Sequence, residues 1–147
     1  MDEKQNLEQI IDSDYGVAVL DTANPVELVS HLKRLTLTTG RAVYDWSSEN
    51  GLYRLGIEHI FIPRTRAPID VLAYITSSRH YGIYLLRDFN EALGRPSVER
   101  QLLKLLEKKD GVRRLVCLIG KSNQLPAAII PHAALLRWDA RRQARTV

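Results

Sequence analysis

The sequence predicts an α/β fold: a three-layer sandwich in which helices cover both faces of a five-stranded, mainly parallel sheet. Continuous apolar runs such as Ile83–Leu86 are typical of strands that are buried on both faces. Segments with apolar residues at helical spacing separate these runs, and strands that alternate with helices indicate parallel pairing with right-handed crossovers. The chain has 147 residues, of which 45% are hydrophobic and 26% charged, which suits one domain with a substantial core.

The first strand and the helix after it carry the clearest local signals. Gly16–Leu20 is a short apolar run that ends at Asp21. Asn24 is a good N-cap, Pro25 suits the first helical position, and Glu27 is placed to complete a capping box. Gly40 supplies the stop for a helix whose leucines and valines repeat at helical spacing.

The later elements follow from the same patterns. Residues 47–65 are the least regular part, and Ile57–Ile62 within them suits either a short edge strand or one helical turn. The other expected elements are, in order, a strand Arg41–Trp46, a helix opened by Pro68, a strand Gly82–Leu86, a helix capped by Ser97, a strand Val112–Ile119, a short turn Pro126–Ile130 and a strand Ala133–Trp138.

The chain divides into an extension, a domain and a tail. Residues 1–15 are expected to form a helical extension with the helix at Glu3–Ile11, residues 16–139 the single α/β domain, and residues 140–147 a basic tail or linker. The net charge is +4, with acids concentrated in residues 1–14 and arginines near the other end. Arg137, Arg141, Arg142 and Arg145 are candidates for binding anions, including nucleic acid, although a short charge run is also typical of a solvated chain end.

Composition also limits the setting in which the protein works. No stretch approaches the roughly 18 consecutive apolar residues of a membrane span, and the acidic N-terminus is unlike a signal peptide. Cys117 is the single cysteine, so an internal disulfide is excluded and a reducing compartment is favoured. We therefore expect a protein of the cytoplasm or of a plastid stroma.

Nucleotide hydrolysis is not expected from this chain. Gly120-Lys121-Ser122 looks like the end of a phosphate-binding loop, but Leu115 stands where the other glycine is required. The proper place for such a loop is after the first strand, where the sequence DTANP holds no glycine. We predict neither a nucleotide nor any other cofactor.

Acidic residues follow three of the predicted strands. Asp21, Asp45 and Asp88 would emerge at one edge of a parallel sheet, near Glu91, and such a group could hold Mg²⁺. The segment VLDTANP resembles the strand-one signature of PIN-type nucleases, although Ala23 separates its Thr and Asn, so a divergent metal-dependent nuclease is one hypothesis. The alternative is a purely structural role, in which these acids cap and terminate strands. The full candidate cluster is Asp21, Asn24, Asp45, Asp88, Glu91, Lys121 and Ser122, and no metal-ligand pattern of His or Cys accompanies it.

Four segments resemble a known family. They are AVYDWSSENGLYRLG, APIDVLAYI, GIYLLRDFNEAL, and LVCLIGKSNQLPAAI followed by the last strand. In order and character they resemble the N-terminal non-catalytic domain of plastid-type AAA+ ATPases, first described as a hypothetical chloroplast reading frame. The resemblance covers roughly residues 16–139 and implies a degenerate P-loop-type sheet, with Asp88 at the Walker-B-like strand end and Phe89 in place of a catalytic Glu.

The favoured hypothesis is therefore a non-enzymatic domain that recruits a partner or substrate, or regulates, for an AAA+ ATPase or as a standalone relative. Its expected partner is a protein or an AAA+ module, with weak nucleic-acid binding through the basic tail as an alternative and no membrane partner. Domains without a phosphate loop keep the sheet because the core specifies it, while function moves to surface loops.

Overall fold

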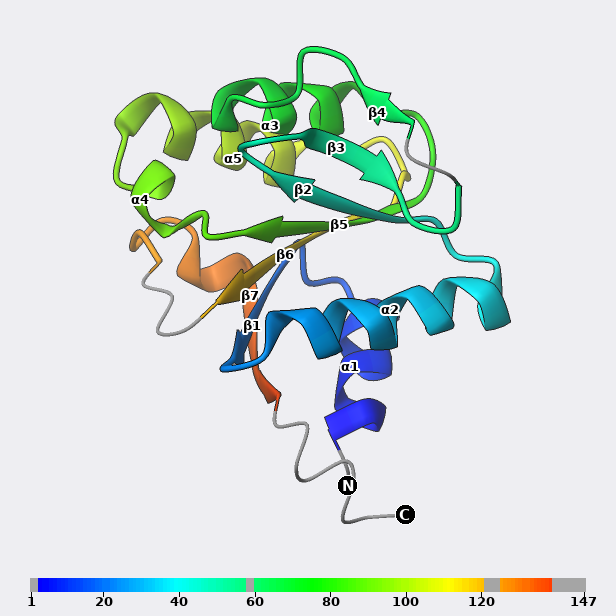
Figure 1. The fold of residues 1–147 in the computed structure, drawn as a ribbon. Coiled ribbons are helices and arrows are strands. Elements are labelled where there is room, and N and C mark those ends of the chain that lie inside the picture. The colour runs from blue at the N-terminus through cyan, green and yellow to red at the C-terminus, as the bar shows by residue number, and fades with distance from the viewer. Residues whose placement is uncertain (1–2, 58–59, 121–124, 139–147) are drawn as a thin grey trace.

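The computed structural model describes residues 3–57, 60–120 and 125–138, and one mixed sheet forms its centre (Figure 1). Within these residues the sheet has seven strands in the order β4-β3-β2-β5-β6-β1-β7. Their bounds are β1 Val17–Thr22, β2 Val43–Ser47, β3 Gly51–Arg54, β4 Phe61–Ile62, β5 Gly82–Arg87, β6 Arg114–Gly120 and β7 Ala133–Trp138.

The five strands expected from the apolar runs form the parallel part of this sheet, β2-β5-β6-β1-β7. The prediction of a five-stranded, mainly parallel sheet is nevertheless wrong, because β3 and β4 extend it with antiparallel pairs beyond β2. Gly51, at φ +83°, begins β3 directly after a tight turn from β2. Strands of four and two residues are too short to show a period in the sequence.

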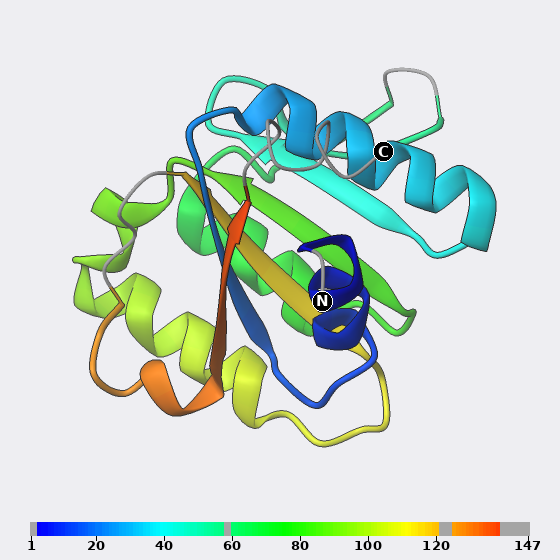
Figure 2. The ribbon, with the colours of Figure 1, turned by 90° about the horizontal axis from the view of Figure 1, so that it is seen from below.

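Helices cover both faces of the sheet, so the predicted three layers are present. Figures 1 and 2 show α1 and α2 on one side and α3, α4 and α5 on the other. Each side has its own cluster of buried side chains, one built on α1 and α2 and one on α3, α4 and α5. The helices are α1 Glu3–Ile11, α2 Pro25–Thr39, α3 Pro68–Ser77, α4 Asn90–Leu93 and α5 Pro96–Glu107, with a 3₁₀ turn η1 at Ile130–His132.

The helix starts follow local chemistry, with one correction. Asn24 caps α2 as predicted, and Gly40 in the left-handed conformation ends it. The predicted cap at Ser97 is wrong, because α5 begins at Pro96 after Arg95. The fixed φ of a proline suits the first helical position, which places Ser97 inside the first turn.

Helix α1 packs into the core of the domain. Leu7 and Ile11 are almost fully buried in the cluster that α2 shares. The guanidinium of Arg113 donates to the carbonyl oxygens of Ile10 and Ile11 and so satisfies the end of the helix. The segment expected as an extension is thus held against the sheet. None of the helices in the described ranges is both long and apolar enough to span a bilayer.

Candidate functional site at the carboxyl ends of the parallel strands

The ends of β1 and β6 lie side by side where the chain changes faces. Asp21 on β1 is in register with Gly120 on β6. After β1 the chain enters α2 on one face, whereas Ile129, beyond β6, is buried in the core of the opposite face. Open α/β sheets bind their ligands at such a point, outside the carboxyl ends of the strands.

The connection from β1 to α2 consists of only Ala23 and Asn24. The side-chain oxygen of Asn24 accepts a hydrogen bond from the backbone N–H of Glu27 at 3.3 Å. The backbone N–H of Asn24 donates to Thr22 Oγ1 at 3.0 Å. In the predicted capping box the Glu27 carboxylate would accept a hydrogen bond from the Asn24 N–H, but this N–H donates to Thr22 Oγ1 instead. Pro25 has no N–H, so one of the donors at this helix end is missing and another is already occupied.

Two of the predicted acids are paired with arginines. Asp21 lies 3.9 Å from Nε of Arg137, whose side chain is 83% exposed. Asp45 makes a bidentate pair with Arg87, at 3.1 Å from its Nε and 2.7 Å from its Nη2, and also accepts a 3.3 Å hydrogen bond from the hydroxyl of Tyr53. Burial raises the pKa of Asp45 above its usual value, and the Arg87 guanidinium partly offsets this.

The placement of Asp45 corrects the prediction that it emerges at the strand end. It lies within β2, opposite Tyr53 of β3 and Leu85 of β5. Its side chain is on the same face as Val43, the face that α2 covers, because side chains alternate along a strand. Leu20 is on that face too, so the adjacent Asp21 is directed to the opposite one.

Asp88 terminates β5 as predicted and makes a turn. Its φ is +53°, a conformation that Asp tolerates better than most residues, and its N–H donates to the carbonyl oxygen of Ile119 at 3.3 Å. The turn delivers Phe89 into the core, where it is 1% exposed and makes an edge contact with Trp46 at 5.3 Å between ring centroids. Glu91 is exposed on α4, beside a shallow pocket that also involves Leu125.

The acids of the nuclease hypothesis are not brought together. β6 separates β1, which carries Asp21, from β5, which precedes Asp88, so these strand ends are about 10 Å apart at the usual strand spacing. Among the described residues, no group of three or more His, Cys, Asp or Glu side chains is arranged to hold a metal ion. Lys121, Ser122, Arg141, Arg142 and Arg145 lie outside the described residues.

Sequence reasoning missed Arg87 and Tyr53 as the partners of Asp45. The available signal was the alternation of side chains along a strand. Asp45 stands two residues after Val43, and Arg87 stands two residues after Leu85, so each charged residue shares a face with a buried apolar one. That pattern says that a charge points inward and needs a partner. It does not say which strands are neighbours.

Comparison with known families decides the relationship. The family model described as "SpoVK-like AAA ATPase, N-terminal domain" matches residues 3–138. The chain belongs to this family. The resemblance to the N-terminal domains of AAA+ ATPases is thus confirmed at this level, over all of the described residues.

The other comparisons add little. Among solved structures, a chain of "Structure of Drosophila ORC bound to DNA" is similar at 16% identity and a TM-score of 0.49. The match covers 92% of this chain and 29% of the ORC chain, so this chain spans less than a third of the length of the chain that it matches. No curated protein sequence matches it significantly.

Proposed function

We propose that this domain is a non-catalytic module that recruits a partner or substrate, or regulates, for an AAA+ ATPase through protein contacts. Its sheet is a degenerate form of the P-loop type, and it does not hydrolyse nucleotide by itself. The observation that carries this proposal is the connection from β1 to α2, which has two residues and caps itself through Asn24.

A triphosphate at this position requires a cradle of backbone N–H groups before the helix and a lysine that reaches the phosphates. The β1–α2 connection has no glycine and no length from which to build that cradle. The first lysine downstream, Lys33, stands more than two turns into α2. The helix end that would attract phosphate is instead occupied by the Asn24 side chain.

The strand end that corresponds to a Walker B motif also favours a structural role. In a P-loop ATPase an acid at this position organises Mg²⁺. Here Asp88 adopts a left-handed turn, and the next residue, Phe89, packs in the core against Trp46. A carboxylate in place of Phe89 would be buried in that core at a large desolvation cost.

Membership of a family of AAA ATPase N-terminal domains supports a division of labour, with hydrolysis assigned to a separate AAA+ module. Within the family we favour a plastid-type relationship, on the four segments quoted above. The buried free thiol of Cys117 suits a reducing compartment, so we place this action in the cytoplasm or a plastid stroma.

Nucleotide binding tests the proposal directly. Millimolar Mg-ATP should leave the melting temperature of the chain where a salt-matched Mg²⁺ control leaves it, because a ligand stabilises only the state that it binds. Phosphate release should stay at the buffer rate. A shift of several degrees with Mg-ATP, or hydrolysis that Asp88→Asn abolishes, would refute the non-catalytic assignment.

A further inference from the structure

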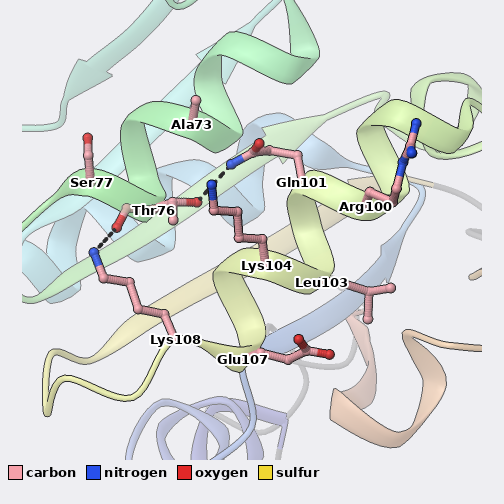
Figure 3. Close-up of a pocket in the computed structure, with 9 residues that line it drawn as sticks. All are labelled: Ala73, Thr76, Ser77, Arg100, Gln101, Leu103, Lys104, Glu107 and Lys108. Atoms are coloured by element: carbon pink, nitrogen blue, oxygen red, sulfur yellow. Dashed lines mark hydrogen bonds between the residues drawn. The ribbon is translucent and has the colours of Figure 1, made fainter.

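A groove lies between α3 and α5, in the helical layer opposite α2 and away from the carboxyl ends of the parallel strands (Figure 3). The groove is open to solvent and has a volume of about 930 Å³. The residues that line it are Ala73, Thr76 and Ser77 of α3, Arg100, Gln101, Leu103, Lys104 and Glu107 of α5, and Lys108 just after that helix.

The two walls of the groove differ in chemistry. Arg100, Lys104 and Lys108 recur at every fourth position, so they place a cation on each successive turn of one wall. They span about 12 Å at 1.5 Å per residue. The α3 wall is neutral and small, with Ala73 and Ser77 exposed, which lets another backbone approach closely. Among the described lining residues, Glu107 is the only carboxylate.

The groove has a rigid frame. Gln101 donates to Thr76 Oγ1 at 3.3 Å, and Lys108 Nζ donates to the carbonyl oxygen of Thr76 at 2.8 Å, as the dashed lines in Figure 3 show. Beneath these bonds the buried sides of both helices join the same core cluster. Arg100 and Lys104 are exposed on the rim, while Lys108 also lies 3.8 Å from Asp110. A partner would therefore meet a surface that is already formed.

We propose that this groove binds an acidic helical segment of a partner protein, an inference that rests on the recruiting role proposed above. Carboxylates at every fourth position of such a helix would face Arg100, Lys104 and Lys108. An apolar residue between them would contact the half-buried Leu103, and the small α3 wall would admit the helix backbone. Two turns of helix match the length of the cationic wall.

The walls favour a helix over an extended peptide. Both are helical and satisfy their own backbone groups, so they offer an extended segment no strand edge with which to form backbone hydrogen bonds. A docked helix satisfies its own backbone groups. Protein is favoured over nucleic acid because no aromatic side chain among the described lining residues offers a surface on which bases could stack, whereas the half-buried Leu103 offers an apolar contact to a protein side chain.

The test uses the full chain and a fluorescent, alanine-based synthetic helix that carries glutamate at every fourth position and leucine beside it. A matched peptide with lysine in place of glutamate and an oligodeoxythymidine of similar charge serve as the other ligands. Fluorescence anisotropy measures affinity, and amide shifts in NMR locate the bound peptide. The wild type should bind the acidic helix, with shifts confined to α3 and α5, and affinity should fall as salt is added.

Charge reversal on the rim provides the decisive variant. Arg100→Glu/Lys104→Glu should weaken binding at least tenfold, and Arg100→Gln/Lys104→Gln should weaken it less, because it removes attraction without adding repulsion. Lys33→Glu/Arg34→Glu on the exposed face of α2 makes the same change in net charge and should leave the affinity unchanged. Melting temperatures of all three variants report whether the fold is kept.

Three outcomes would overturn the inference: no binding by the wild type, equal losses in the rim and α2 variants, or tighter binding of the oligonucleotide through the same residues. The last would assign the groove to nucleic acid. If the groove fails while Mg-ATP still gives no thermal shift, the non-catalytic assignment stands and the partner site lies elsewhere.

Discussion

The pair of Asp45 and Arg87 gives the most quantitative test of the structure. Replacing Arg87 by leucine removes both of its hydrogen bonds and leaves the Asp45 carboxylate, whose side chain is 6% exposed, without a cation. Only Tyr53 and the backbone N–H of Trp46 remain as hydrogen-bond donors. Breaking a fully buried pair costs about 3–5 kcal/mol. Because the Arg87 side chain is 32% exposed, we expect Arg87→Leu to lower the free energy of unfolding by about 2–3 kcal/mol at neutral pH.

The loss should depend on pH in a definite direction. Burial already raises the pKa of Asp45, and removing Arg87 raises it further. A carboxyl whose pKa is higher in the folded state binds more protons there than in the unfolded chain. Stability therefore falls as pH rises from the unfolded pKa, near 3.8, through the folded pKa, and it falls further in the variant. The difference between wild type and Arg87→Leu should be smaller at pH 5 than at pH 7.5.

Urea unfolding at the two pH values, followed by circular dichroism, measures both quantities. The double variant Asp45→Asn/Arg87→Leu is the matched control, since it removes the buried charge together with its partner and should recover part of the loss at pH 7.5. A loss below about 0.5 kcal/mol, the size of an ordinary surface substitution, would refute the buried-pair argument. So would a loss that is the same at both pH values.

Three further predictions address packing. Gly82→Ala should lower the free energy of unfolding by about 3 kcal/mol in denaturant titrations, because a Cβ there would lie 2.5 Å from the hydroxyl of the buried Tyr84. The control is Gly40→Ala, at φ +73° with open space around it, which should lower the free energy of unfolding by only about 1 kcal/mol. Equal losses in the two variants would contradict the predicted clash at Gly82. Thr65→Val should lower the free energy of unfolding by about 1–2 kcal/mol and speed amide hydrogen exchange in β3 and β4. The Thr65 hydroxyl links these strands, because it accepts from the N–H of Leu52 at 2.9 Å and donates to the carbonyl oxygen of Ile62 at 2.7 Å. Unchanged exchange rates would disprove that link. Burial raises the pKa of Cys117 to about 12, so a thiol reagent at pH 8 should label it only as fast as the chain unfolds, and rapid labelling of the native protein would show that β6 is open to solvent.

Local patterns in the sequence determined most of the elements. The apolar runs before Asp21 and Asp88 are buried strands, and the Asn24-Pro25 start and Gly40 stop of α2 lie where the sequence places them. These features depend on the chemistry of a few adjacent residues and on burial, which periodicity reports. The family resemblance came from the same segments and is confirmed at the level of AAA+ ATPase N-terminal domains.

Which charged residues lie together depends on which strands are neighbours, and only the tertiary structure decided that. β1 lies between β6 and β7, so Asp21 is set apart from Asp88, and the antiparallel pairing of β3 with β2 brings Tyr53 to Asp45. The bond from Arg87 to Asp45 joins residues 42 positions apart in the sequence. A residue's side-chain period tells whether it faces the core, but the partner that neutralises it there is set by strand order and register, and no local pattern carries that information. The same is true of the groove between α3 and α5: the spacing of Arg100, Lys104 and Lys108 is visible in the sequence, whereas the neutral wall opposite them exists only because the two helices pack side by side on one face of the sheet.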